Sequence, residues 1–178
     1  MLAVCARKPV HLKPLLICAL DTAMRKSEML KLRWQDVDFG AGIMRVKASN
    51  SKTERARTVP MTSRLRNELT RLEQRRIHNM DELVFGVRDN VKRSFMSACR
   101  EAKIEGFRLH DCRHTAITRM IECGISAEKT MKYSGHSQVT TFLRYLNPTN
   151  QSVNHDAERL EDFNLNNQLE NDVSDAVN

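Results

Sequence analysis

The segment from position 108 to 115, RLHDCRHT, concentrates imidazole and guanidinium groups. His110 and Arg113 are three residues apart, so on a helix they share a face and can contact the same oxyanion. His110 and His114 also have the spacing of a zinc-binding HxxxH pair, but the intervening glutamate and an evident third ligand are missing. We therefore expect no metal here. The segment indicates either an anion-binding face or histidines that only pack within a helix.

Two further reactive groups follow. Gly135 allows a tight turn that would present His136, and Tyr145 lies near the end of a predicted helix that Pro148 would terminate. A tyrosine can serve as a nucleophile that forms a covalent intermediate. Most tyrosines, however, are half-buried packing residues, and taken alone this one fits that description better.

Basic residues nearer the N-terminus could complete such a site. Arg25 precedes a predicted helix, and Glu28, one turn later, could brace its planar guanidinium in an ion pair. Lys52 lies in a polar loop between two predicted strands, where it could act as a cation or proton donor. The ordinary alternatives are a surface Arg–Glu pair and a solvated loop lysine.

Together these groups satisfy the requirements of in-line displacement at a phosphodiester. That reaction needs a nucleophile, cations on the non-bridging oxygens and a proton for the leaving oxygen. If the partner is a phosphodiester, Tyr145 is the candidate nucleophile and His110 the first candidate for the base that takes its proton, although each residue alone has the ordinary explanation given above.

The elements that must position these residues are mainly helical. Apolar residues at helical spacing predict helices over 12–20, from 27, over 65–72, 91–102, 110–123, from 126 and over 137–145. Thr62, Asp89 and Ser126 are the expected N-caps.

A small sheet is expected between the second and third helices. Residues 37–39, 43–48 and 55–60 read as strands, the first two joined by a turn at Gly40 to Gly42. The predicted fold class is α+β, a mainly helical domain with a small three-stranded antiparallel sheet.

The charge distribution favours a polyanionic partner. Residues 151–178 carry seven acidic and one basic residue, so the first 150 carry 28 basic and 15 acidic residues, a net charge of +13. A strongly basic body favours nucleic acid, although many basic proteins bind none.

The length of 178 residues suits one domain, which we place at 1–150, with a C-terminal helix and an acidic, partly disordered tail over 151–178. Val153, Ala157, Leu160 and Phe163 would form the apolar stripe of that helix. The five cysteines lack metal or CxxC spacing and are expected to be mostly buried thiols. The apolar stretch 14–20 is too short to cross a bilayer and no signal peptide is evident, so we expect a cytoplasmic protein.

In this order and with these neighbours, the reactive segments resemble the catalytic domain of the tyrosine recombinase (phage integrase) family, from about Leu15 to Pro148. The resemblance implies six catalytic residues and one supporting acid. These are Arg25 as the first arginine, Lys52 as the strand-loop lysine, His110 and Arg113 of the HxxR motif, His136 as the later histidine and Tyr145 as the nucleophile, with Glu28 as the acidic brace. Ala23 and Cys112 replace the glycine and leucine that are usual at their positions, and neither change removes a functional group.

The resemblance further implies site-specific recombination of double-stranded DNA through a 3′-phosphotyrosyl intermediate, without a metal or other cofactor. It implies self-association on DNA, in which the C-terminal helix can dock on a neighbouring protomer. Relatives usually carry an N-terminal DNA-clamping domain, and because only about ten residues precede the match, we expect this domain to be absent here.

Two alternative functions stay open at this point. A type IB topoisomerase shares the Arg, Lys, His and Tyr chemistry but rejoins the same strand, and the GHS sequence at 135–137 favours the recombinase. A non-catalytic DNA-binding remnant of an integrase would contact phosphates without recombining them.

Overall fold

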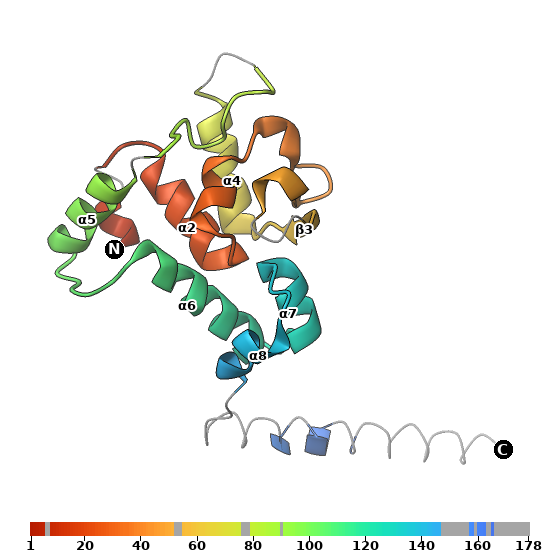
Figure 1. Ribbon diagram of the computed structural model, residues 1–178. Coiled ribbons are helices and arrows are strands. Elements are labelled where there is room, and N and C mark those ends of the chain that lie inside the picture. Colours follow the sequence, from red (N-terminus) through yellow and green to blue (C-terminus); the bar gives the residue numbers. More distant parts are fainter. Residues whose placement is uncertain are drawn as a thin grey trace. The chain divides into compact units, whose positions relative to one another are not determined.

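The structure is a computed structural model that describes residues 1–5, 8–51, 55–75, 79–89, 91–146, 157, 158, 160–162 and 165. The chain divides into two compact units, Met1–Tyr145 and Leu146–Asn178. Figure 1 shows that the first unit consists of packed helices with a small sheet at one side. The predicted fold class is confirmed.

Three kinds of element make up the described part of the first unit. The α-helices are α1 (Leu2–Cys5), α2 (Leu12–Thr22), α3 (Lys26–Leu30), α4 (Ser63–Glu73), α5 (Lys92–Glu101), α6 (Leu109–Glu122), α7 (Ala127–Ser134) and α8 (Val139–Phe142). The 3-10 helices are η1 (Trp34–Asp36), η2 (Ala48–Asn50) and η3 (Leu143–Tyr145). The strands are β1 (Val37–Asp38), β2 (Ile43–Val46) and β3 (Arg57–Pro60).

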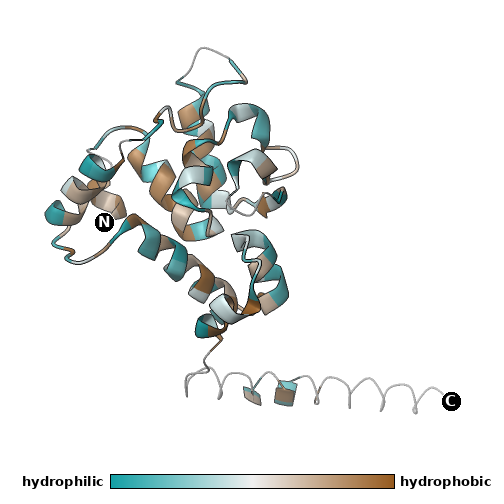
Figure 2. Cartoon of the chain, in the orientation of Figure 1, coloured by the Kyte–Doolittle hydropathy of each residue, from teal (hydrophilic) through white to brown (hydrophobic). Residues whose placement is uncertain are grey.

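Helix α2 forms the centre of the first unit and packs against both α4 and α6. Its buried residues include Leu12, Leu15, Leu16, Ile17, Cys18 and Ala19. A helix that is apolar on most sides is stable only when neighbouring elements cover it. Figure 2 shows this apolar character along α2, and a hydrogen bond from Arg113 to the Ala23 carbonyl holds the end of α2 beside α6.

The three strands form one antiparallel sheet in the order β1-β2-β3. Met44 lies opposite Val37 on one side and Val59 on the other. Met44, Val46 and Val59 are buried, whereas their strand neighbours are more exposed, as the period of two predicts. The sheet therefore matches the sequence-based prediction.

Two of the three predicted N-caps are confirmed. The side chains of Thr62 and Ser126 accept hydrogen bonds from Leu65 N–H and Lys129 N–H. The prediction for Asp89 is wrong, because α5 begins at Lys92 with Val91 as its N-cap and no side-chain cap. Asp89 is therefore two residues before the N-cap position, too far back to reach the free amides of the first turn.

The helix predicted over 137–145 is shorter and divided, since α8 ends at Phe142 and the tighter turn η3 carries the chain to Tyr145. Pro148, which we expected to end this helix, lies outside the described residues. In the second unit Ala157 and Leu160 are helical, and Val153 and Phe163 lie outside the described residues. No helix in the described ranges is long and apolar enough to cross a membrane.

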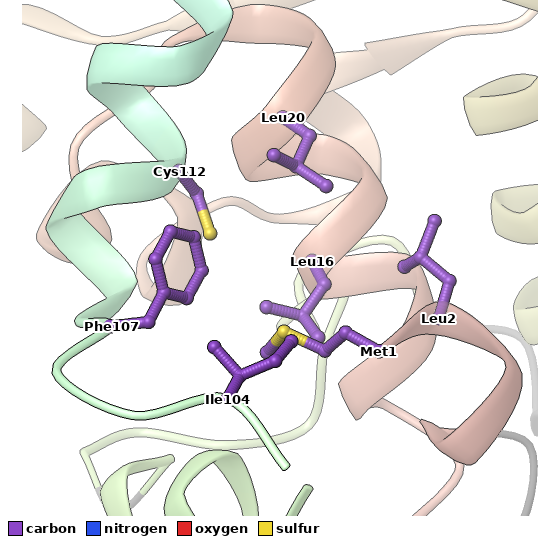
Figure 3. Close-up of a pocket in the computed structure, with 7 residues that line it drawn as sticks. All are labelled: Met1, Leu2, Leu16, Leu20, Ile104, Phe107 and Cys112. Carbon is purple, nitrogen blue, oxygen red and sulfur yellow. The ribbon is translucent and has the colours of Figure 1, made fainter. Parts of the chain in front are cut away.

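An apolar pocket of about 200 Å³ opens between α1, α2 and α6. Figure 3 shows the side chains around it, including Leu16 and Leu20 of α2 and Cys112 of α6. Phe107 and Ile104, from the segment before α6, complete one side. Cys112, at a position where a leucine is usual in the family resembled, is among the side chains that line this space.

Candidate active site

The turn between α2 and α3 presents Arg25. The chain leaves α2 through Ala23, which has a left-handed conformation (φ 54°, ψ 19°). The Glu28 carboxylate accepts hydrogen bonds from the Arg25 backbone N–H (2.8 Å) and from its guanidinium (3.2 Å). Glu28 is fully buried, whereas the Arg25 side chain is 22% exposed. The ion pair expected between these residues is present, and it fixes both the backbone and the side chain of Arg25.

Arg57 on β3, which the sequence analysis missed, supports this pair. Its Nη1 and Nη2 donate to the two carboxylate oxygens of Glu28 (2.9 and 2.6 Å), and its Nε donates to the Tyr133 carbonyl (2.8 Å). Burial raises the pKa of Glu28, but the hydrogen bonds and charges of Arg57 and Arg25 offset this and hold the pKa below its ordinary value. The available signal was strand alternation, which puts Arg57 on the same face as buried Val59.

Arg113 on α6 is almost fully buried and joins two other helices. Its Nη1 donates to the carbonyl of Ala23 at the end of α2 and to that of Ser134 at the end of α7 (2.7 Å for the latter). Its Nη2 faces the His136 ring, 3.4 Å from Nε2. Burial, followed by the positive charge of Arg25, lowers the pKa of Arg113 to about 10, so the side chain remains a cation at pH 7.

His136 follows a glycine turn, as the sequence suggested. Gly135 has φ 70°, and its carbonyl accepts a hydrogen bond from Arg25 Nη2 (3.0 Å). His136 Nδ1 lies 2.7 Å from Ser134 Oγ. Burial, with the charges of Arg113 and Arg25, lowers the pKa of His136 to about 4. In the free protein the ring is therefore neutral at pH 7 and can contribute a hydrogen bond but no charge.

Tyr145 lies among aromatic rings at the end of η3. Its hydroxyl is hydrogen-bonded to Nδ1 of His114. On its other sides lie His136, with ring centroids 6.1 Å apart, and buried Phe142, at 5.5 Å. Burial raises the pKa of Tyr145, in spite of the opposing charges of Arg144 and Arg113. The phenol thus lies beside the same histidine that faces Arg113.

The last two predicted residues are placed differently. His110 is exposed and contacts His114 edge-on, with ring centroids 4.8 Å apart. Among the described residues no hydrogen bond joins His110 to Tyr145, and the histidine that is hydrogen-bonded to the phenol is His114. Lys52 lies outside the described residues.

The structure therefore connects Arg25, Arg113, His136 and Tyr145 in one cluster of contacts, with the buried Glu28 carboxylate against Arg25. Two cations, a neutral imidazole and a phenol are groups that can bind an anionic oxygen and attack a phosphorus atom. Within the described ranges, no group of three or more His, Cys, Asp or Glu residues is placed to hold a metal ion.

Comparison with known proteins defines the family. Residues 1–152 match the family model described as Phage integrase family. The chain therefore belongs to the phage integrase family. It is 33% identical over 129 residues to the shufflon-specific DNA recombinase of Escherichia coli, covering 71% of this chain and 32% of that protein. It is 26% identical over 152 residues to the integrase of Salmonella phage P22, covering 75% of this chain and 38% of that protein.

Solved structures agree on the fold. The crystal structure of XerA recombinase matches with a TM-score of 0.73 at 18% identity, covering 89% of this chain and 60% of that one. The catalytic domain of bacteriophage HP1 integrase matches with a TM-score of 0.64 at 25% identity, covering 82% and 80%. The chain spans about a third of the length of the two curated relatives named above.

Proposed function

We propose that this chain is the catalytic domain of a site-specific DNA recombinase that attacks a backbone phosphate with Tyr145. The observation that carries the proposal is the position of the phenol. It lies beside His136, whose ring faces the guanidinium of Arg113. A nucleophile next to preorganised cations is what phosphoryl transfer requires, and membership of the phage integrase family supports the same reaction.

Four further residues have a role in this proposal. Arg25 and Arg113 neutralise the charge that builds on the phosphoryl oxygens, and His136 donates a hydrogen bond to one of them. Lys52 protonates the departing 5′-oxygen. Because the 3′-phosphotyrosyl bond retains the energy of the broken ester, a second 5′-hydroxyl can reverse the attack without ATP. Strand exchange rather than hydrolysis is the expected outcome.

The proposed partner is double-stranded DNA. Two structural neighbours, the Tn1549 transposon integrase and the XerH recombinase, were solved with DNA, the latter bound to its difH substrate. The net charge of +13 over residues 1–150 of this chain favours a polyanion of the same kind. Binding should weaken steeply with salt, because phosphate contacts release counterions.

Covalent capture tests the reaction. The full chain is incubated with a library of random-sequence DNA duplexes that carry nicks. Cleavage close to a nick releases a short fragment with a 5′-hydroxyl, and once this fragment has diffused away the strand cannot be rejoined, so the adduct accumulates. We expect a protein–DNA adduct that survives SDS and forms in EDTA. Tyr145→Phe should abolish the adduct and leave DNA binding intact, since only the nucleophilic oxygen is removed. The matched control is Tyr133→Phe, at the other tyrosine of the chain, because within the described part of the chain Tyr133 reaches the site through its backbone carbonyl, which the change keeps.

The outcomes are distinct. An undiminished adduct in Tyr145→Phe refutes the nucleophile, and an adduct that requires a divalent metal refutes the metal-free reaction. If the captured sequences share no motif, and the protein relaxes a supercoiled plasmid that carries no recombination site, the activity is that of a topoisomerase.

We further propose that the C-terminal segment contributes to self-association on DNA. Leu160 and Leu165 are helical and 61% and 58% exposed, so they offer apolar surface. Light scattering of the full chain on its captured DNA site should give a larger assembly than the same chain shortened after Asn150. Equal masses would contradict this role.

A further inference from the structure

The proposed reaction needs a group that takes the phenolic proton of Tyr145. A tyrosine has an ordinary pKa near 10, and burial raises the pKa of Tyr145 further, so the phenol keeps its proton at pH 7. The proton must leave as the oxygen attacks phosphorus. A general base must therefore lie within hydrogen-bonding reach of the phenolic oxygen.

His114 meets this requirement. Its Nδ1 is hydrogen-bonded to the Tyr145 hydroxyl, and the two ring centroids are 5.6 Å apart. The rigid helix α6 holds it one residue after buried Arg113. We propose that His114 is the catalytic base that accepts the Tyr145 proton, an inference that rests on the recombinase function proposed above.

The surroundings keep His114 in the form that can accept a proton. Burial, followed by the charge of Arg144, lowers the pKa of His114 below its ordinary value of 6.5, so the ring is neutral at pH 7. With Nδ1 as the acceptor, the ring proton is on Nε2. The titratable and charged groups that face the ring are Arg108, His110, Asp111 and Arg113 from α6 and its start, His136 from the turn before α8, and Arg144 and Tyr145 from η3.

His110 is less suited to this role. It is exposed and meets the edge of the His114 ring rather than the phenol. From the sequence, His110 was the first candidate for this base; three residues before Arg113 on α6, it can instead contact the same phosphate oxygen. His114 then serves the nucleophile, one helical turn further along α6.

The proton and electron pairs balance in the proposed step. The O–H bond of Tyr145 breaks, its proton moves to His114 Nδ1, and the oxygen lone pair forms the bond to phosphorus. The bond from phosphorus to the 5′-oxygen breaks, and that oxygen takes a proton from Lys52. In the rejoining step a 5′-hydroxyl returns its proton to Lys52, attacks phosphorus and releases Tyr145, which recovers its proton from His114.

Three variants test the base by single-turnover adduct formation between pH 5 and 10. The wild-type rate should fall in acid as His114 becomes protonated. His114→Ala should be about 100-fold slower at pH 7, the usual effect of losing a general base, and its rate should rise about tenfold per pH unit as phenolate forms. His114→Asn, whose amide oxygen can accept the hydrogen bond but not the proton, should be equally slow. Imidazole in the buffer should restore part of the His114→Ala rate. Thr118→Ala, an exposed position one turn along α6, is the control and should match the wild type.

A second measurement needs no DNA. In a ¹⁵N spectrum of the histidine side chains, the Nδ1 resonance of His114 should move in Tyr145→Phe because its hydrogen-bond donor is lost. An unmoved resonance, or a His114→Ala variant with the wild-type rate and pH profile, overturns the base while the recombinase function stands. Absence of any adduct from the wild type overturns that function, and the base with it.

Discussion

A Cβ atom added to Gly135 would lie 3.0 Å from Cζ of Arg57. The guanidinium cannot withdraw freely, because Glu28 and the Tyr133 carbonyl hold all three of its nitrogens. The glycine before His136 thus meets two separate needs: its backbone has φ 70°, and the absent side chain leaves room for Arg57.

Gly135→Ala should therefore cost more than backbone strain. Gly106 is the matched control, since it has φ 68° and nothing within 4 Å of an added Cβ. Gly106→Ala should lower the free energy of unfolding by about 1 kcal/mol through the left-handed conformation alone. Gly135→Ala should cost about 1–3 kcal/mol more and slow adduct formation, because Arg57 and His136 must move. Equal losses in urea unfolding would show that Arg57 adapts without cost.

Glu28→Gln should destabilise the protein by about 3 kcal/mol at pH 7, because two arginines would lose a buried charge. The folded-state pKa of Glu28 lies below its ordinary value of 4.5, so its stabilisation is complete above pH 4.5 and is lost as the pH falls through the folded pKa. The variant should therefore lose less stability than the wild type between pH 5 and 3. Glu122→Gln, an exposed change on α6, should stay within about 0.5 kcal/mol. Parallel acid profiles of Glu28→Gln and wild type would contradict the buried pair.

His136 should titrate near pH 4 in the free protein, as followed by its ring resonances in NMR, because burial and two arginines disfavour the imidazolium. A bound DNA phosphate adds negative charge, so the midpoint should rise in the complex. Since the folded pKa is depressed, the contribution of His136 to stability is complete above pH 6.5 and declines as the pH falls toward 4. A midpoint near 6.5 without DNA would mean that the ring does not face Arg113.

Cys112→Leu should raise the free energy of unfolding by about 1 kcal/mol, because a leucine would fill part of the apolar pocket beside Leu16 and Leu20. Cys18→Leu is the contrasting change. Cys18 is fully buried inside α2 and lines no part of that pocket, so overpacking should cost about 1–3 kcal/mol. Thermal unfolding of both variants measures the difference, and a destabilised Cys112→Leu would show that the pocket cannot accept the larger side chain.

The sequence predicted the fold well where a local pattern coincides with packing. Met44, Val46 and Val59 alternate as a half-buried sheet requires, and the caps Thr62 and Ser126 immediately precede their helices. The N-cap prediction for Asp89 was wrong because α5 begins after Val91, which is buried in the core. A cap motif in the sequence does not show which residue the core will bury.

The features of the site that could not be predicted from the sequence are contacts between residues far apart in the chain. His114 and Tyr145 are 31 positions apart, and Arg57 and Glu28 are 29 apart, so neither pair has a local signature. His114 was considered only as half of a metal-binding pair. The role of Lys52 stays a prediction, since it lies outside the described residues.

Arg113 caps the C-terminal ends of two helices. The same guanidinium nitrogen donates to the carbonyl of Ala23, the C-cap of α2, and to that of Ser134, the last residue of α7. Burial and the charge of Arg25 disfavour this cation and lower its pKa to about 10, but loss of the side chain would deprive both carbonyls of this donor, a cost that is present before any substrate arrives. Selection for folded protein alone, with no DNA in the assay, should therefore retain arginine at 113 while accepting phenylalanine at 145. Part of what looks like a catalytic signature in this chain is imposed by folding.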